Sequence, residues 1–359
     1  NEFEHLYKIS GREYHIFDYY GADDAEFAVV CMGSGTEVLK QTAKKLNQMG
    51  YKVGVLCVRL YRPFDAQYFV DKLPKTVKTI AVLDRTKEAG AVGEPLFVDV
   101  CTAIMQMERK ISVIGGRYGL GSFEFNPAMA KAVFDNLMKK HPKNHFTVGI
   151  TDDVTNLSLD VDYSFKIDSG MRECVFFGIG GDGTISANKN SAKIIGSTGL
   201  HSQAYFVYDS KKSGSMTVSH LRFGGEPISA PYQIDNAGFV AIHNFSFVAK
   251  LDVLQYLANN GTVLLNYPFE VNKLNDFLPD YFVASLKEKN AKLYIVDALA
   301  GAKKLGLKNK INIIMQSAFF KLSNIMPFDK AKEKMADFIK KSYSKFGEKV
   351  VAANIQAID

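Results

Sequence analysis

The chain has 359 residues and a mass of 39.9 kDa, which at roughly 150 residues per domain predicts two or three domains. Its composition, 47% hydrophobic and 23% charged with 28 glycines and 10 prolines, is typical of a folded globular protein and excludes disordered, collagenous and coiled-coil classes. The formal net charge is +6, a mild excess that favours phosphate-bearing ligands but falls short of a nucleic-acid-binding footprint. No apolar stretch of about 18 residues occurs, so the sequence predicts no membrane-spanning helix.

The four cysteines lie in or beside apolar runs, which predicts buried, unpaired thiols in a reducing compartment. They are Cys31, Cys57, Cys101 and Cys174. Because no CxxC spacing occurs, we expect no iron–sulfur cluster or structural zinc held by this chain. The sequence begins at Asn1 without an initiator Met or a signal-peptide pattern, and we interpret it as a processed chain or a segment of a longer protein.

The first half alternates short apolar runs with helical patterns in the rhythm of βαβ units, which predicts a mostly parallel sheet covered by helices. Strands are predicted at Ala25–Met32, Val53–Arg59, Thr79–Leu83, Ser112–Ile114 and Phe146–Ile150, with an edge strand in Tyr14–Tyr20. Helices are predicted at Thr36–Met49, Gly93–Met107 and Asn126–Lys140, each opened by a capping or turn-forming residue.

Between Thr151 and Arg172 the helical period is lost and polar, acidic and turn-forming residues dominate, which indicates an inter-domain connection. We therefore predict a domain boundary near residue 170. In the second half, strands are predicted at Glu173–Phe177, Ala204–Tyr208, Met216–Arg222, Gly238–Ile242, Thr262–Leu265 and Lys292–Val296. Helices are predicted at Thr184–Ile195 and, in a mainly helical last third, at Asp297–Leu305, Asn312–Leu322, Phe328–Tyr343 and Gly347–Ala357.

The sharpest local motif is a glycine-rich loop, residues 178–184, directly after an apolar strand and directly before a helix. It reads Gly178, Ile179, Gly180, Gly181, Asp182, Gly183 and Thr184. Glycines here let backbone N–H groups face a ligand at a helix N-terminus, whose partial positive charge favours a phosphate. The loop also satisfies G-x-G-x-x-G, and Asp209 ends the next strand near the spacing of a ribose-binding acid. A dinucleotide site and a tight turn without a ligand both stay open, because Asp182 puts a carboxylate inside the cradle.

Amide and basic side chains follow this loop. Asn188 and Lys189 lie in the first turns of the predicted helix, Lys211 and Lys212 follow the next strand, and Arg222 ends the strand after it. Such groups can hold a diphosphate or a ribose phosphate by charge-assisted hydrogen bonds. Taken one at a time, a solvated helix face or a charged turn explains each lysine better, whereas their grouping around one loop favours a phosphate ligand.

A thiamine diphosphate site is a further candidate, because the segment 181–183 begins like the metal-binding motif of that cofactor. The motif needs a downstream Asn as a second oxygen ligand of Mg²⁺, and at that spacing the sequence has Tyr208-Asp209-Ser210. We therefore assign no thiamine site to this chain. The histidines show no metal-ligand spacing such as H-x-x-H, and we predict no catalytic or metal-binding residue.

Several long runs also stand at or near the ends of predicted strands. In the first half they are RLYRPF at 59–64, AVLDRTKE at 81–88, IGGRYG at 114–119 and HFTVGI at 145–150. In the second half they are GGDGT at 180–184, YFVYDSKKSG at 205–214, SHLRFG at 219–224 and MQSAFFKL at 315–322. In this order the runs resemble the central part of the pyruvate:ferredoxin (flavodoxin) oxidoreductase family, from about residue 25 to the end.

The resemblance implies an α/β fold of two α/β domains. Residues 1–170 would form a mostly parallel sheet like the C-terminal domain of transketolase, and residues 171–359 a Rossmann-like gamma domain with a helical C-terminal part. The parent enzyme would cleave pyruvate on thiamine diphosphate with Mg²⁺, pass electrons through 4Fe–4S clusters to ferredoxin or flavodoxin, and form acetyl-CoA. Because the family's gamma domain closes over the active site and helps to hold coenzyme A, the expected cofactor contacts are Gly178, Gly180, Gly181, Asp182, Gly183, Thr184, Asn188, Lys189, Lys211, Lys212 and Arg222.

The sequence lacks the family's first domain, its cysteine clusters and its last domain, and Gly181 stands where we expect Ser in many relatives. We therefore expect a segment that is inactive alone, from an enzyme that is homodimeric at full length. Its expected partners are the remaining domains and, through them, ferredoxin or flavodoxin, with no nucleic acid or membrane. The expected location is the cytoplasm or a reducing organelle of anaerobic metabolism. Two alternatives stay open: a non-catalytic assembly module, and an NAD-binding Rossmann-type domain supported by G-x-G-x-x-G and Asp209.

Overall fold

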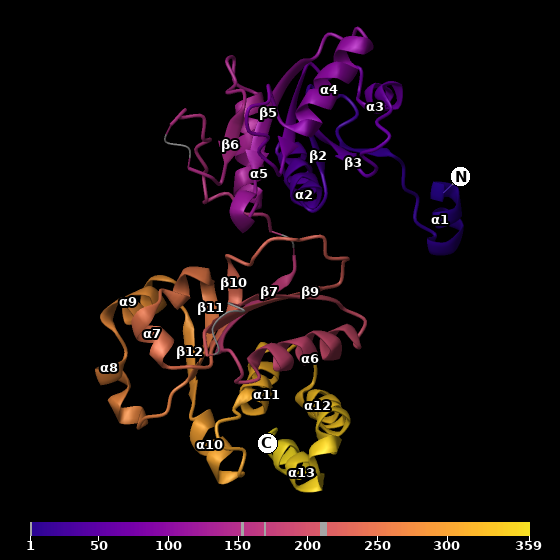
Figure 1. Ribbon diagram of the computed structural model, residues 1–359. Coiled ribbons are helices and arrows are strands. Elements are labelled where there is room, and N and C mark those ends of the chain that lie inside the picture. Colours follow the sequence, from indigo (N-terminus) through magenta and orange to yellow (C-terminus); the bar gives the residue numbers. More distant parts are fainter. Residues whose placement is uncertain (1, 152–153, 169, 209–213) are drawn as a thin grey trace. The chain divides into compact units, whose positions relative to one another are not determined.

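The computed structural model describes residues 2–151, 154–168, 170–208 and 214–359, which form two compact units (Figure 1). The first unit comprises Asn1–Asp168 with Ser229–Tyr232, and the second Ser169–Ile228 with Gln233–Asp359. Within the described ranges, no helix is both long enough and apolar enough to cross a bilayer. The four cysteines are free thiols, and three of them are buried, as their apolar surroundings predict.

The sheet of the first unit has six strands in the order β1-β3-β2-β4-β5-β6. Their bounds are Phe17–Gly21 for β1, Phe27–Met32 for β2, Val53–Val58 for β3, Thr79–Asp84 for β4, Ser112–Tyr118 for β5 and Phe146–Val148 for β6. Strands β2 to β6 are parallel, and β1 pairs antiparallel with β3 at the edge. The mostly parallel sheet predicted from the sequence is confirmed, including its edge strand.

Helices cover both faces of this sheet. The covering helices are α2 Gly35–Gln48, α3 Ala66–Lys72, α4 Pro95–Gln106 and α5 Pro127–Leu137, with a 3-10 turn at Leu120–Ser122. Helix α1, Glu2–Ser10, precedes β1 and buries none of its residues. The buried residues of α2 and α5 pack on one face and those of α3 and α4 on the other. Capping explains two of the starts, because Asp65 accepts a hydrogen bond from Tyr68 N and Asn126 accepts one from Met129 N.

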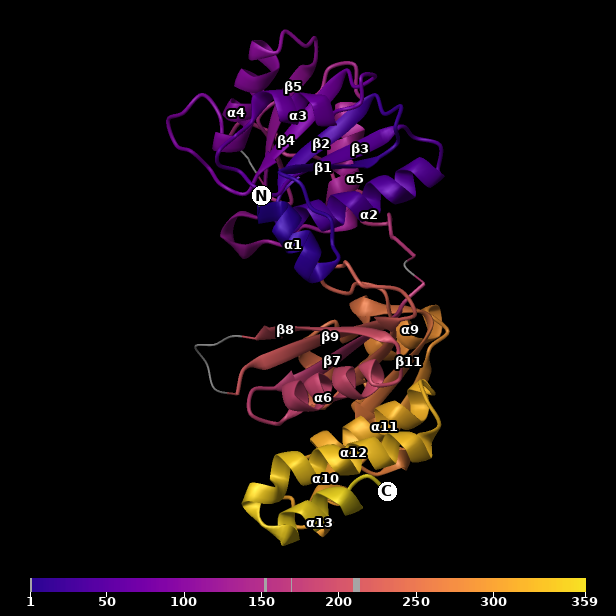
Figure 2. The same cartoon turned by 90° about the vertical axis from the view of Figure 1, so that its right-hand side faces the viewer.

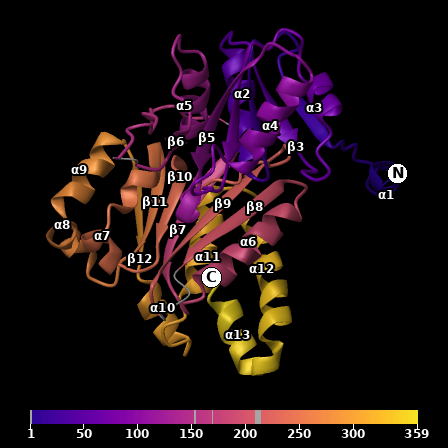
Figure 3. The ribbon, with the colours of Figure 1, turned by 45° about the horizontal axis from the view of Figure 1, so that its top comes forward.

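The sheet of the second unit has the order β12-β11-β10-β7-β9-β8. Its strands are β7 Arg172–Ile179, β8 His201–Tyr208, β9 Met216–Gly224, β10 Ala237–Ile242, β11 Leu257–Asn266 and β12 Lys292–Val296. Strands β7, β10, β11 and β12 are parallel, whereas β9 runs antiparallel to both β7 and β8. The α/β class is confirmed. The sheet differs from a purely parallel Rossmann sheet because β8 pairs locally with β9, and β9 takes the place beside β7 (Figure 3).

Two helical layers enclose this second sheet. The helices are α6 Thr184–Gly196, α7 Ser246–Lys250, α8 Leu274–Phe277, α9 Asp280–Glu288, α10 Ala298–Lys304, α11 Asn312–Ser323, α12 Phe328–Tyr343 and α13 Glu348–Gln356, with short 3-10 turns at Val253–Tyr256, Val271–Lys273 and Ser344–Phe346. Helices α6, α10, α11 and α12 share one hydrophobic cluster with the sheet, and α7 and α9 belong to the cluster on the opposite face. Figure 2 shows α10 to α13 gathered beside α6. The helical C-terminal part expected from the sequence is therefore present.

Candidate functional site

The glycine-rich loop lies at the carboxyl end of β7, and glycine is required at its positions for different physical reasons. Gly181 and Gly183 have φ angles of +90° and +93°, which favour glycine over other residues. At Gly178 an added Cβ would lie 2.5 Å from Thr184 Oγ1, so a larger residue would displace the start of α6. An added Cβ at Gly181 would meet open space. Gly181 therefore presents the exposed backbone surface of the loop.

Asp182, one residue before the N-cap Gly183, acts as a cap of helix α6 by binding its first amide. Its Oδ1 accepts a hydrogen bond from Thr184 N, and its Oδ2 accepts one from Ile179 N, both at 2.7 Å. A carboxylate at this position satisfies an N-terminal amide and interacts favourably with the helix dipole. The donor that a phosphate would use at Thr184 is thus taken by the chain itself. A ligand phosphate must contact the loop elsewhere, at its exposed backbone or its flanks.

A buried hydrogen bond joins the loop to the next strand of the sheet. Thr184 Oγ1 lies 2.7 Å from Nδ1 of His243, which directly follows β10, and both residues are buried. Burial lowers the pKa of His243 to about 4, although the nearby charge of Asp182 acts in the opposite direction. The imidazole is therefore neutral at pH 7. His243 N also donates to Phe177 O at 2.9 Å, so this residue holds the ends of β7 and β10 together.

Asn266 extends the same network to the third strand. It ends β11, its Nδ2 donates to His243 O at 3.0 Å, and its Oδ1 accepts from Ala298 N at 3.1 Å at the start of α10. Both ends of this buried amide are therefore paired, as a buried polar group requires. These hydrogen bonds fix the carboxyl ends of β7, β10 and β11 relative to one another.

A crevice of about 430 Å³ lies at these strand ends. Helix α6 leaves β7 toward one face of the sheet and α7 leaves the neighbouring β10 toward the other. This is a topological switch point, the place where open α/β sheets bind ligands. The crevice is lined by Ile179, Gly181, Asp182, His243, Asn244, Phe245, Asn266, Pro268, Leu299, Asn309, Lys310 and Ile311.

Lys310 is the one cation among these lining residues. Its Nζ donates to Gly181 O at 2.7 Å, which fixes the ammonium beside the exposed turn of the glycine loop. Apolar side chains, among them Phe245 and Leu299, form another part of the lining. The crevice therefore suits a ligand that combines an anionic or polar group with an apolar body.

The structure places the sequence-predicted basic and amide residues in different environments. Asn188 is a buried residue of α6, so it faces the interior of the second unit. Lys189 is exposed on α6, and its Nζ lies 5.4 Å from the ring centroid of Phe206 on β8. Lys211 and Lys212, like Asp209, lie outside the described residues. The segment that follows them does reach the glycine loop, since Gly180 N donates to Ser215 O at 2.8 Å.

Arg222 does not join the glycine loop. Thr217 is the β9 partner of Gly178, whereas Arg222 pairs with Glu173 five residues away along β7, which corresponds to roughly 16 Å. The physical reason is the antiparallel direction of β9, which carries its C-terminal end to the amino edge of β7. There the guanidinium is 2% exposed and its Nε lies 2.7 Å from Glu173 Oε1. Arg222 thus has a structural role inside the sheet.

Sequence reasoning missed His243, Asn266 and Lys310 as parts of this site. A signal for the first two was present, because each follows or ends a predicted strand, and the carboxyl ends of parallel strands meet at one edge of a sheet. Lys310 had no local signal, since it reaches Gly181 across 129 positions of sequence.

Comparisons with known proteins agree over the whole chain. Residues 173–359 match the family model described as pyruvate ferredoxin/flavodoxin oxidoreductase, and residues 25–127 match that of pyruvate:ferredoxin oxidoreductase core domain II. The chain is 49% identical over 358 residues to the pyruvate:ferredoxin oxidoreductase of Moorella thermoacetica, covering 99% of this chain and 31% of that protein. It is 50% identical over 366 residues to the pyruvate-flavodoxin oxidoreductase of Rhodospirillum rubrum, with 99% and 31% covered.

Two further proteins extend this comparison. The pyruvate dehydrogenase [NADP(+)] of Cryptosporidium parvum is 46% identical over 368 residues, covering 99% of this chain and 19% of that protein. Among solved structures, the 2-oxoglutarate:ferredoxin oxidoreductase from Magnetococcus marinus is similar with a TM-score of 0.42 and 20% identity, covering 53% of this chain and 30% of that one. The chain thus spans about a third of the length of the two bacterial relatives above.

Proposed function

The chain belongs to the pyruvate ferredoxin/flavodoxin oxidoreductase family, and from this premise we propose that it is the central two-domain segment of such an enzyme. The parent enzyme would convert pyruvate, coenzyme A and oxidised ferredoxin or flavodoxin into acetyl-CoA, CO₂ and the reduced acceptor. The observation that carries this proposal is 49% identity to a pyruvate:ferredoxin oxidoreductase over 99% of the chain. The first unit would correspond to the transketolase C-terminal-like domain and the second to the gamma domain.

The redox and thiamine chemistry would belong to other parts of the enzyme. Among the described residues no group of three or more His, Cys, Asp or Glu side chains is placed to hold a metal ion, and three of the four thiols are buried apart from any such group. We therefore propose no ligand of a 4Fe–4S cluster among the described residues. We assign those cofactors to the remaining domains, which would also contact ferredoxin or flavodoxin.

For the second unit we propose a role in coenzyme A capture and in covering the active site. The geometry that supports this role is the carboxyl edge of β7, where Gly181 is exposed, Lys310 holds its carbonyl and Lys189 stands on the adjoining helix. Lys211 and Lys212 precede the segment that contacts Gly180. Because Asp182 occupies the helix terminus, the phosphates of coenzyme A would meet these lysines rather than the amide of Thr184.

Isothermal titration calorimetry of this chain with coenzyme A tests the proposal, with NAD as the competing ligand. Coenzyme A should bind saturably, and a Lys211→Ala/Lys212→Ala chain should lose that binding. The matched control is Lys340→Ala/Lys341→Ala, which removes two adjacent exposed lysines from α12 and should bind normally. Preference for NAD would support the dinucleotide-binding alternative. No binding of either ligand to the folded chain would refute capture by this unit and favour an assembly module.

A further inference from the structure

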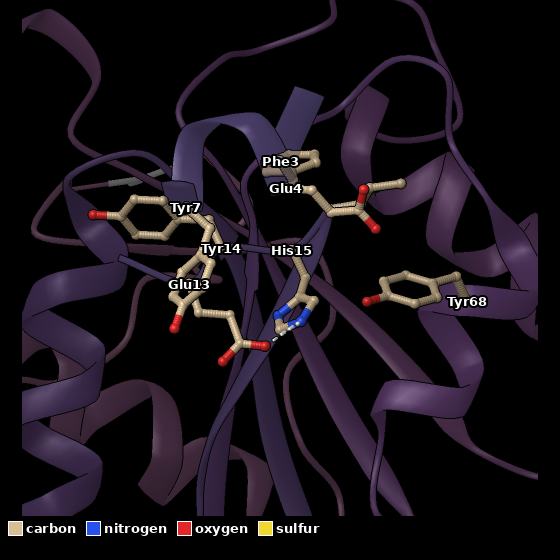
Figure 4. A pocket seen from close by; sticks show the side chains of 8 residues that line it. Phe3, Glu4, Tyr7, Glu13, Tyr14, His15 and Tyr68 are labelled. Atoms are coloured by element: carbon tan, nitrogen blue, oxygen red, sulfur yellow. Dashed lines mark ion pairs between the residues drawn. The ribbon is translucent and has the colours of Figure 1, made fainter. Parts of the chain in front are cut away.

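The first unit contains a cavity of its own, of about 550 Å³. It lies where α1 leads into β1, and α3 supplies one further wall (Figure 4). The lining residues are Phe3, Glu4, Tyr7, Glu13, Tyr14, His15, Ile16 and Tyr68. Aromatic rings and carboxylates thus dominate its surface.

Four aromatic rings line this cavity, those of Phe3, Tyr7, Tyr14 and Tyr68. The negative faces of such rings attract cations, and several rings around one space form the known type of cage for a cationic group. Two of these rings already attract cations of the chain itself. Arg59 Cζ lies 4.5 Å from the centroid of Tyr14, and Lys72 Nζ lies 5.2 Å from that of Tyr68. Neither Arg59 nor Lys72 is among the residues that line the cavity.

The charges at the cavity are complementary to a cation. Glu4 and Glu13 contribute carboxylates, and the described lining contains no lysine or arginine. His15 lies between two acids, with Nε2 at 3.3 Å from Glu13 Oε1 and Nδ1 at 2.9 Å from Asp18 Oδ1. The Glu13 side chain is 74% exposed, so one of its oxygens can accept a hydrogen bond from an incoming group without a change in the backbone. Asp18 is held by Arg59 and is not available in the same way.

Helix α1 adds an apolar surface beside the cavity. None of its described residues is buried, and Leu6, Tyr7 and Ile9 are 41%, 54% and 72% exposed. Exposed apolar side chains next to an acidic aromatic cavity have the composition of a protein interface, in which aromatic residues and arginine are enriched. At 3.6 residues per turn, Leu6 adjoins the side of α1 that bears the lining residues Phe3 and Tyr7, whereas Ile9 lies on the far side of the helix.

We propose that this cavity is a docking site for an arginine side chain of another polypeptide segment. The guanidinium enters between the aromatic rings and pairs with the carboxylates of Glu4 and Glu13, while an apolar residue that flanks the arginine covers Leu6. Arginine fits better than lysine, because its planar group stacks on rings and donates two parallel hydrogen bonds to a carboxylate.

The test uses the peptide acetyl-Leu-Arg-Leu-amide and its citrulline analogue, which has the same shape without the charge. The chain is labelled with ¹³C in its tyrosine rings, and the signals of Tyr7, Tyr14 and Tyr68 are assigned from Tyr→Phe variants. The arginine peptide should shift these three signals saturably. The citrulline peptide should bind about tenfold more weakly, the effect expected for losing a cation from a partly exposed site with two carboxylates and several rings.

A Glu4→Gln/Glu13→Gln chain should lose about fivefold or more in affinity for the arginine peptide. The matched control, Glu333→Gln/Glu348→Gln, removes the same charge from exposed positions of α12 and α13 and should bind like the unchanged chain. Equal binding of the citrulline peptide, full affinity in the Glu4/Glu13 variant, or no saturable shift at millimolar peptide would each overturn the proposal. A shift that depends only on the concentration of the chain would also overturn it, since a second copy would then be the occupant.

Discussion

Replacing Asp182 by alanine should destabilise the second unit by about 2–3 kcal/mol. The substitution removes the acceptor of two hydrogen bonds of 2.7 Å, from Ile179 N and Thr184 N, and the favourable interaction of a carboxylate with the dipole of α6. Loss of a helix cap costs about 1 kcal/mol. Loss of the second hydrogen bond, to a charged acceptor, costs about 1.5 kcal/mol, because water only partly replaces that acceptor at this half-buried site. Asp182→Asn keeps one acceptor oxygen and should cost about half as much.

Hydrogen–deuterium exchange followed by mass spectrometry measures this loss of stability at the α6 amides themselves. Protection of the first turns should fall in Asp182→Ala, and added inorganic phosphate should restore part of it, because an anion can then occupy the vacated helix terminus. Asp337→Ala, at an exposed position of α12, is the control and should change stability by less than about 0.5 kcal/mol. A loss in Asp182→Ala no larger than in this control would refute the capping role.

Three other changes test separate parts of the structure. Burial lowers the pKa of His243 from 6.5 to about 4, so between these two pH values the unfolded chain binds more protons than the folded chain. The free energy of unfolding should therefore be highest above pH 6.5 and fall toward pH 4. His243→Gln should reduce this fall, measured as the difference between urea midpoints at pH 7 and pH 5. Arg222→Ala should cost about 3 kcal/mol in urea unfolding, because it removes the buried guanidinium that pairs with Glu173. A change below about 1 kcal/mol would contradict the structural role. Gly116→Ala should cost about 2–3 kcal/mol by thermal unfolding, because its Cβ would lie 2.2 Å from Phe146 Cζ, whereas Gly225→Ala, with open space around it, should be nearly neutral.

Much of the first unit follows from local patterns. The apolar runs that become β2 to β5 are buried from both faces, and such runs stand out between helices with a regular period. Helix α1 was missed because its nine residues are too few for a helical period to appear. Helix α3, with seven residues, is shorter still. Its capping residue, Asp65, was the available signal.

Strand pairing and long-range contacts were beyond local patterns. The run 216–224 was recognised as a strand, yet alternation of side chains does not reveal the direction in which a strand pairs. The antiparallel pairing of β9 with β7 is what moved Arg222 away from the site. The glycine loop was found because its spacing is local, and the sequence showed that Asp182 puts a carboxylate inside the phosphate cradle. Its role as the cap of α6 required the backbone geometry.

We propose that the second unit holds coenzyme A through its phosphates, beside the lysines at the carboxyl edge of β7. The most direct test compares the dissociation constants of coenzyme A and pantetheine, which lacks the phosphates and the adenosine, on this chain at low and moderate salt. Coenzyme A should bind saturably, with an affinity that falls as salt rises, and pantetheine should show no measurable binding. Equal affinity for the two compounds, or coenzyme A binding that is indifferent to salt, would contradict it.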